Sequence, residues 1–252
     1  MRESKSFVIE KGNKVFYGVM AFFIVLTILG SIHFRNLDFE RARRHLLIFN
    51  LFSLTLTTIY RIRLIDDKEY METVYPRVKN SWWFELPFFP CNTAEILYSL
   101  AIFLNFRGLL SYCFFLGFIG PILAFSSPPL GFEKENFFRL RMLGFYCTHY
   151  FCLMNIPFMM ISGYYVPEYR DIPYALLIYA IFSTIMYFMN RYIDSLELGY
   201  PANYFFVMDP DFHPLFRKAY DFIPYRLIFT YPLILLVGLI LSIFVFLLRI
   251  FV

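Results

Sequence analysis

The chain has 252 residues, of which 59% are hydrophobic and 17% are charged, and its mean hydropathy is +0.57. Soluble domains are typically about half apolar and a quarter charged, so this composition excludes a soluble fold and predicts a membrane protein. The net charge of +4 comes mostly from loop residues that set membrane orientation, and we expect no nucleic-acid partner.

Seven apolar runs are candidates for transmembrane helices, each of which needs about 20 residues to cross the hydrocarbon core. In chain order they are residues 15–34, 45–60, 88–106, 108–125, 142–161, 172–193 and 227–248. The second run is the shortest, and its loss would change the topology. The sequence therefore predicts one all-α integral membrane domain over residues 1–252, built as a seven-transmembrane-helix bundle.

Basic residues give the expected orientation of this bundle. Lys and Arg are concentrated in the N-terminal tail and in the second, fourth and sixth loops. Because cytoplasmic loops carry the excess of positive charge, we expect a cytoplasmic N-terminus and an external C-terminus. The first loop, with Arg35, Arg41, Arg43 and Arg44, is the exception to this pattern.

Glu95 in the third run and His149 in the fifth are ionisable residues, which membrane spans rarely contain without a functional reason. Cys91 and Tyr98 share a helix face with Glu95 because they lie four residues before it and three after it. In the predicted orientation Cys91 and His149 lie near the same end of the bundle. A thiol and an imidazole at similar depth fit a nucleophile and its general base. The alternative is a structural role, in which these side chains only tie helices together.

No metal ion or cofactor is expected. Cys147 and Cys152 flank His149, but Cys147 lies about 160° away around the helix and cannot join the other two in one zinc site. Asp209 and His213 are cation ligands by type, yet carboxylates beside prolines usually form turns.

Five short motifs follow one another between about residues 86 and 248. They are Leu86-Pro87-Phe88-Phe89-Pro90-Cys91-Asn92, Gly117 and Gly120 followed by Ser127-Pro128, Phe145-Tyr146-Cys147-Thr148-His149, Ala202-Asn203-Tyr204-Phe205-Phe206, and Pro224-Tyr225. In order and spacing this set resembles the YwaF-type integral membrane protein family. Two positions depart from that pattern, because Phe89 replaces a polar residue and Pro201 or Ala202 replaces a glycine.

The resemblance implies a function in lipid metabolism. It relates the chain to a mammalian polytopic phospholipid acyltransferase that uses a cysteine acyl-enzyme, and more distantly to androgen-induced fatty-ester hydrolases that use a histidine. Cys91 and His149 are the matching positions. The implied partners are membrane lipids, namely an acyl donor and a lysolipid acceptor.

The leading hypothesis is therefore a membrane lipid acyltransferase or esterase with Cys91 as nucleophile and His149 as general base. The side chains expected to bind substrate or to stabilise the oxyanion are Glu95, Tyr98, Asn203 and Tyr204. The main alternative is a transporter or ligand-binding membrane subunit in which Glu95, His149 and Asn203 hold a solute or proton. A third is a non-catalytic lipid-binding or assembly protein.

Overall fold

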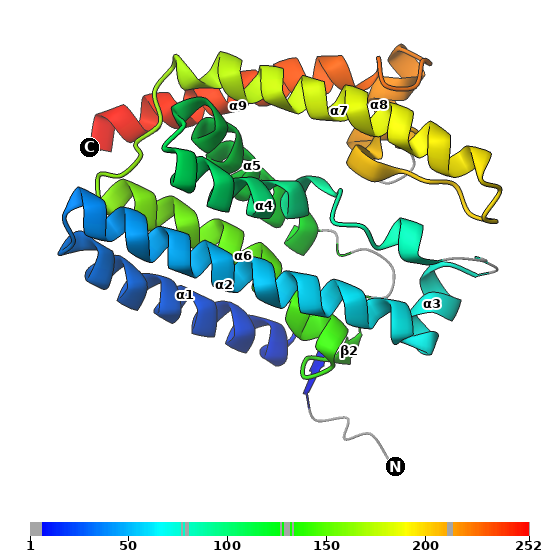
Figure 1. The fold of residues 1–252 in the computed structure, drawn as a ribbon, viewed down its shortest axis with the longest axis horizontal. Helices are drawn as coiled ribbons and strands as arrows, with labels where there is room; N and C mark the ends of the chain where they lie inside the picture. The colour runs from blue at the N-terminus through cyan, green and yellow to red at the C-terminus, as the bar shows by residue number, and fades with distance from the viewer. Residues whose placement is uncertain are drawn as a thin grey trace.

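The computed structural model describes residues 7–76, 78, 81–126, 128, 132, 134–210 and 214–251, which fold into helices lying roughly side by side (Figure 1). In chain order the elements are β1 (Val8–Ile9), α1 (Lys14–Arg35), α2 (Phe39–Asp66), α3 (Lys68–Val74), the 3-10 helix η2 (Ser81–Phe84), α4 (Pro90–Leu104), α5 (Arg107–Ser126), β2 (Glu135–Asn136), α6 (Leu140–Ile161), α7 (Asp171–Ser195), the 3-10 helix η3 (Tyr204–Phe206), α8 (Pro214–Phe222) and α9 (Thr230–Phe251). The only strands in these residues are the two-residue β1 and β2, which pair antiparallel.

The predicted all-α fold is confirmed. Each of the seven apolar runs lies largely within one of the long helices α1, α2, α4, α5, α6, α7 and α9. Five of these, α1, α2, α5, α7 and α9, are long and apolar enough to cross a membrane. The predicted count of seven membrane spans includes α4 and α6, which are not among these five helices.

Helix α2 is much longer than the predicted run of residues 45–60. Its N-terminus is capped by Asp38, whose carboxylate accepts a hydrogen bond from the Arg41 backbone N–H at 2.9 Å. Its C-terminal part continues through Arg61 and Arg63. The arginines that suggested a loop therefore belong to the ends of the helix, and only residues 36–38 separate α1 from α2.

Helix α4 is shorter than the predicted run of residues 88–106. It begins at Pro90, which suits the first turn of a helix because its ring fixes φ and no backbone N–H is needed there. It ends at Leu104 and is followed by the C-cap residue Asn105, which has a left-handed conformation with φ of +50°. The flanking phenylalanines extend the apolar run but lie outside the helix.

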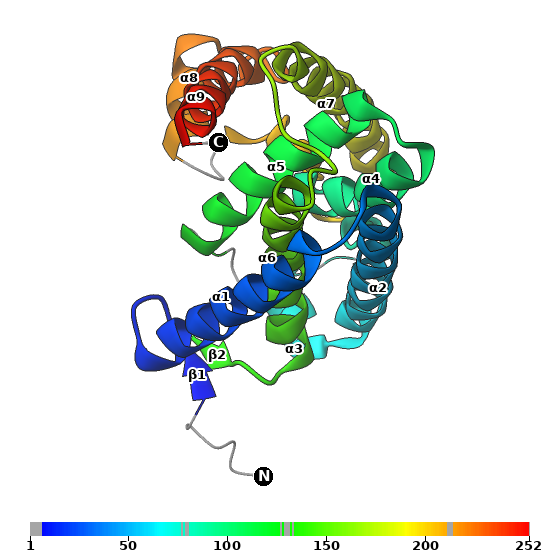
Figure 2. The same ribbon diagram turned by 90° about the vertical axis from the view of Figure 1, so that its left-hand side faces the viewer.

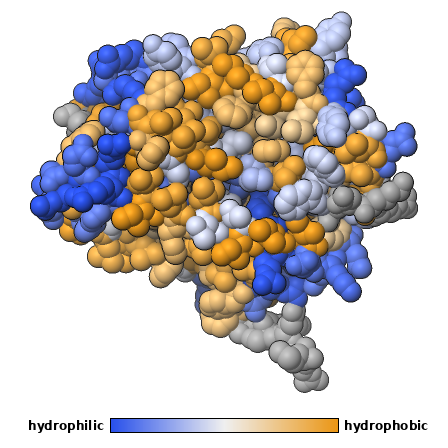
Figure 3. All heavy atoms as spheres, in the orientation of Figure 1, coloured by the Kyte–Doolittle hydropathy of each residue, from blue (hydrophilic) through white to orange (hydrophobic). Residues whose placement is uncertain are grey.

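Helix α6 lies at the centre of the bundle and packs against α1, α2, α4 and α5. Beyond it, α5 packs against α7, and α7 packs against α9, as the end-on view in Figure 2 shows. The outer helices expose large apolar side chains, such as Ile28 of α1, Phe188 of α7 and Leu235 of α9. In Figure 3 the apolar surface forms a broad central region with hydrophilic residues towards both ends of the helices, as expected for a bilayer-embedded body.

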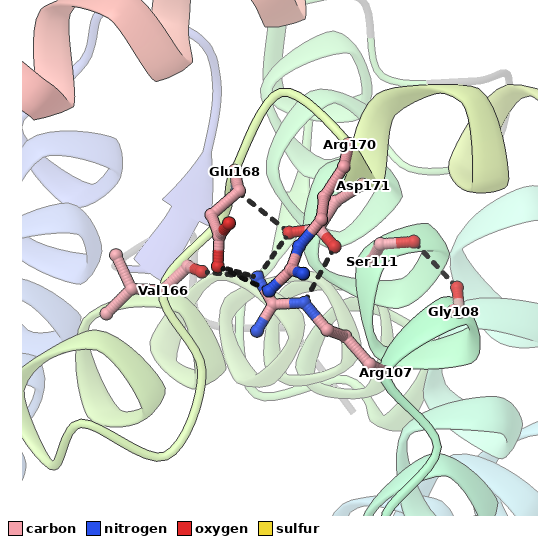
Figure 4. A network of polar contacts seen from close by, with 7 residues as sticks. All are labelled: Arg107, Gly108, Ser111, Val166, Glu168, Arg170 and Asp171. Carbon is pink, nitrogen blue, oxygen red and sulfur yellow. Dashed lines mark hydrogen bonds and ion pairs between the residues drawn. The ribbon is translucent and has the colours of Figure 1, made fainter.

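Successive long helices alternate in direction, so the bundle has two distinct ends. One end, called here the α3 end, holds β1, α3, α8, the C-terminus of α2 and the N-terminus of α4 (Figure 1). At the opposite end, Arg107 binds both carboxylate oxygens of Asp171 at 2.7 and 2.8 Å and contacts Glu168 at 2.9 Å (Figure 4). The buried Asp171 thus joins the first turns of α5 and α7.

Candidate functional site

The candidate site begins with a polar stripe on α2. Asn50, Ser53, Thr57 and Arg61 recur every three or four residues and therefore share one face of the helix. Asn50 makes two side-chain hydrogen bonds with Asn155 of α6, at 2.8 and 2.9 Å. The stripe thus faces the interior of the bundle, where hydrogen bonds hold neighbouring helices together.

Glu95 of α4 lies against the middle of this stripe and is 1% exposed. Its Oε1 atom accepts hydrogen bonds from the hydroxyls of Ser53 and Thr57, the latter at 2.9 Å. Thr57 in turn is 2.8 Å from the hydroxyl of Thr148 on α6. Oε2 of Glu95 is buried and has no partner among the described residues. The carboxyl group therefore links α2, α4 and α6 through one oxygen and leaves the other unused.

Arg61 forms a second polar cluster, one turn further along α2. Its Nη1 atom is 2.7 Å from Oε2 of Glu85, and its Nη2 atom donates to Oδ1 of Asn92 at 2.8 Å. The hydroxyl of Tyr70 donates to Oε1 of Glu85 at 2.9 Å. Burial and the negative charge of Glu85 raise the pKa of Tyr70, which keeps this hydroxyl protonated as a donor. Glu85 is thus satisfied from two sides.

A cavity of about 120 Å³ connects the two clusters. Its lining residues with polar side chains other than Trp82 are Thr57, Thr58, Arg61, Glu85, Asn92 and Glu95, and the remaining lining is mainly aliphatic. Neither Cys91 nor His149 is part of it. The two predicted groups of functional residues, the catalytic pair and Glu95, therefore face different spaces.

Cys91 is the second residue of α4 and lies where α4, α5 and α6 meet. A Cβ atom added at Gly120 of α5 would come within 2.6 Å of the Cys91 sulfur, so the absent side chain of Gly120 makes room for the thiol. On the α6 side, the thiol of Cys152 is 3.8 Å from the Cys91 carbonyl oxygen. The nucleophile candidate thus has a defined place against both neighbouring helices.

His149 lies on the same turn of α6 as Cys152, about 4.5 Å along the axis at 1.5 Å per residue. Its Nδ1 atom is 2.6 Å from the carbonyl oxygen of Phe145. Because a carbonyl only accepts, Nδ1 carries the proton and Nε2 is left as the acceptor. The ring also contacts Phe125, five residues beyond Gly120 on α5. Cys91 and His149 therefore border the same helix junction, although no hydrogen bond joins them in the described part of the chain.

The other predicted binding residues are not gathered at this junction. The Tyr98 hydroxyl is fully buried against Gly117, between α4 and α5. The Asn203 side chain closes its own loop, accepting from the backbone N–H groups of Met208 and Asp209 at 3.0 and 3.1 Å. The hydroxyl of Tyr204 donates to the carbonyl of Trp83 at 2.6 Å.

Two cation ligands were considered in the loop before α9. Asp209 is among the residues that the structure describes, whereas His213 lies outside them. The residues that are described contain no group of three or more His, Cys, Asp or Glu side chains placed to hold a metal ion.

The sequence profile of the TMEM164 family matches residues 12–248. The chain belongs to this family. TMEM164-family proteins are membrane proteins, and with its apolar helices this identifies the chain as an integral membrane protein. No curated protein and no solved structure matches the chain. Its relation to YwaF-type proteins and to acyltransferases stays a prediction.

Sequence reasoning missed the partners of Glu95 in this TMEM164-family protein. Ser53, Thr57 and Thr148 are small hydroxyl residues, which apolar spans contain without special function. The available signal was the spacing of Asn50, Ser53, Thr57 and Arg61, which puts these four polar side chains on one face of a helix.

Proposed function

We propose that this TMEM164-family protein is a membrane lipid acyltransferase or esterase that forms an acyl-enzyme on Cys91 with His149 as general base. The observation that carries the proposal is the hydrogen bond from Nδ1 of His149 to the Phe145 carbonyl. It fixes the tautomer with an unprotonated Nε2, on the turn of α6 that borders Cys91. A base oriented by a third group is the arrangement used to activate weak nucleophiles.

The reaction has two steps. In the first, Nε2 of His149 takes the thiol proton of Cys91, the sulfur attacks the carbonyl carbon of an acyl ester, and the departing alkoxide receives the proton from His149. In the second, a lysolipid hydroxyl or water gives its proton to Nε2 and attacks the thioester, which returns the thiol. A shift of the Cys91 or His149 side chain must bring the two into hydrogen-bond distance, as is common when substrate is bound.

Of the four predicted substrate-binding residues, Glu95 is the best placed. Its unpartnered Oε2 belongs to a side chain that lines a cavity. Tyr98 has an unpartnered hydroxyl but is fully buried between helices. Asn203 and Tyr204 use their side chains to shape the loop between α7 and α9, and we assign them a positioning role for Trp83 and its neighbours.

Seven membrane crossings with a cytoplasmic N-terminus complete the proposal. Helices α4 and α6 are buried among other helices and carry polar residues on their inner faces, including Glu95 and Asn155. Such polar residues lower the mean hydropathy of α6, while α4 has 15 residues, fewer than the about 20 of a typical span, so we propose a shorter crossing for it. Glycosylation tags placed at both termini test the orientation: modification of the C-terminal tag alone is expected, and modification of the N-terminal tag would contradict it.

Acyl transfer by the purified full chain tests the enzymatic proposal. With a phospholipid donor and a lysophospholipid acceptor, Cys91→Ala and His149→Gln are expected to lower the rate by at least about a hundredfold, the contribution typical of a general base. Cys147→Ala is the matched control, since Cys147 lies on α6 but on a different face. Equal rates in Cys91→Ala and Cys147→Ala would reject the acyl-enzyme.

A second function, binding or transport of a solute or proton, is favoured by the buried, unpartnered Oε2 of Glu95. Cys91→Ser distinguishes the two. Solute binding is expected to survive this substitution, whereas acyl transfer is expected to be lost or strongly slowed.

A further inference from the structure

A polar groove at the α3 end lies outside the candidate site. It has a volume of about 500 Å³, and its lining consists of Tyr187, Arg191, Asp194 and Ser195 of α7 with Met208 and Arg226 from the chain between η3 and α9. None of these lining residues belongs to α4 or α6, the helices that carry Cys91 and His149. The groove is therefore a separate feature that the proposed function does not use.

The two arginines of this groove have no acidic partner among the described residues. Arg191 contacts Tyr187, since its Nη1 atom donates to the Tyr187 hydroxyl at 3.5 Å and its guanidinium group lies 6.0 Å from the ring centroid. Arg226 forms neither an ion pair nor a side-chain hydrogen bond within the part of the chain that the structure describes. By contrast, Arg61 and Arg107 both pair with buried acids. Two accessible guanidinium groups beside one groove are thus left for a ligand.

The charges of the groove favour an anion. Asp194 supplies a carboxylate, but its Oδ1 atom accepts the backbone N–H of Ala202 at 2.8 Å and so fixes the chain that follows α7. The two arginines outweigh this one carboxylate, and the lining is net positive. Guanidinium groups bind phosphate and carboxylate oxygens best, because their fixed N–H donors match two oxygens at once. The groove therefore fits a ligand that presents several oxygens and more than one negative charge.

The depth of the groove in the membrane indicates where this anion comes from. Helix α7 has 25 residues, so at 1.5 Å per residue it is roughly 37 Å long and its ends lie near opposite surfaces of a bilayer. Arg191 is one turn from the C-terminal end of α7, at the α3 end. The adjacent Tyr192 and Tyr225 are 53% and 64% exposed, as is typical of tyrosines at the level of the lipid headgroups. The groove therefore lies where lipid phosphates are found.

We propose that Arg191 and Arg226 bind the phosphomonoester headgroup of an anionic membrane lipid in this groove. A phosphomonoester carries about 1.5 to 2 negative charges at pH 7, so it matches two unpaired guanidinium groups better than a phosphodiester does. A soluble phosphate ester shares this chemistry, and the depth of the groove favours the lipid. No bond forms or breaks here and Cys91 takes no part, so the bound lipid is distinct from the acyl donor and acceptor of the proposed function.

Fluorescence quenching of Trp83 tests the proposal, because its ring lies 5.9 Å from that of Tyr192, the neighbour of Arg191. The chain has two tryptophans, so full-length protein carrying Trp82→Phe in phosphatidylcholine nanodiscs reports on Trp83 alone. The probes are phosphatidic acid, phosphatidylglycerol and phosphatidylcholine with the same dibrominated chains. Phosphatidic acid is expected to quench at mole fractions about tenfold lower than the other two, as one additional charge-assisted hydrogen bond implies. Quenching that persists in excess glycerol 3-phosphate assigns the site to the lipid, whereas its reversal would assign the site to a soluble ester.

Substitutions of exposed residues separate the groove from the general surface charge. Arg191→Gln and Arg226→Gln are each expected to reduce the preference for phosphatidic acid at least about fivefold. Arg63→Gln removes an exposed arginine at the same end of the bundle that does not line the groove, and it is expected to keep the preference. Asp194→Asn retains the Oδ1 acceptor for Ala202 but loses the negative charge, so it is expected to strengthen quenching by phosphatidic acid.

Three results would overturn the proposal. They are equal quenching by phosphatidic acid and phosphatidylglycerol, an unchanged preference in both Arg191→Gln and Arg226→Gln, and a loss in Arg63→Gln as large as in the groove variants. All of these side chains are exposed, so each variant is expected to unfold at the wild-type Tm. Acyl transfer by Arg191→Gln at the wild-type rate, with lipid quenching lost, would show that this site and the acyl-enzyme are independent.

Discussion

The ion pair between Arg61 and Glu85 is expected to contribute strongly to stability, and Arg61→Met tests this. The substitution keeps most of the side-chain volume but removes two close contacts, to Glu85 at 2.7 Å and to Asn92 at 2.8 Å. The Glu85 side chain is 0% exposed, so its charge cannot be transferred to water when Arg61 is lost.

The expected loss follows from the burial of each partner. Breaking a buried ion pair costs about 3–5 kcal/mol because one charge is left uncompensated. Arg61 is 15% exposed and Tyr70 still donates to Glu85, which places the loss near about 3 kcal/mol. At roughly 2–4 °C per kcal/mol for a chain of this size, the Tm is expected to fall by about 6–12 °C.

Thermal unfolding followed by circular dichroism in detergent measures this loss. Arg63→Met is the matched control, since Arg63 lies on the exposed side of the same helix, and its effect is expected to stay within about 0.5 kcal/mol. Adding Glu85→Gln to Arg61→Met removes the unpaired charge and is expected to restore at least half of the lost Tm. Equal losses in the Arg61 and Arg63 variants, or no recovery in the double variant, would refute the reasoning.

Three further predictions concern packing, the opposite end of the bundle and pH. Gly144→Ala is expected to lower the free energy of unfolding by about 1–3 kcal/mol, and with it the Tm, because the added Cβ would overlap the Tyr60 ring. Gly18 has open space around it, so Gly18→Ala is expected to be neutral or slightly stabilising in the same thermal assay. Asp171→Ala is expected to lower the free energy of urea unfolding by about 2–3 kcal/mol, because it leaves Arg107 without its bidentate partner. Arg170→Ala, at a more exposed ion pair, is expected to lower it by less than about 1 kcal/mol. Equal effects of the two substitutions would contradict the assigned role of Asp171. Burial, and then the charge of Glu85, raise the pKa of Tyr70 and Tyr75 above the ordinary value of 10, so the folded state holds protons that the unfolded state releases. The stability that these two tyrosines contribute is fully present below about pH 10 and is expected to be lost above it, with a shallower fall in Tyr70→Phe. A stability profile that is flat across the alkaline range would be incompatible with these shifts.

The sequence predicted the helices that are apolar all along their length. The runs for α1, α5, α6 and α7 agree with the observed helices within two residues at each end. The predicted run for α2 was too short, because mean hydropathy assigns Arg61 and Arg63 to a loop. In the structure both belong to the helix: Arg61 pairs with Glu85 inside the bundle, and Arg63 is exposed. For α4 it was too long, because apolar composition does not reveal where Pro90 and Asn105 set the helix ends.

The candidate site was predictable residue by residue but not as an arrangement. Intramembrane position alone singled out Glu95 and His149. The partners Glu85 and Ser53 come from other segments, and their contacts depend on how the helices pack. Likewise, nothing in the residue pattern shows that the Asn203 amide is used within its own loop.

The most direct test of the acyl-enzyme is mass mapping of the intact protein after brief exposure to a phospholipid donor without acceptor. A hydroxylamine-sensitive acyl group on Cys91 is predicted, absent in Cys91→Ala and greatly reduced in His149→Gln, with the Cys147→Ala control labelled like wild type. Acylation at another cysteine, or none in a preparation that transfers acyl groups, would contradict the account.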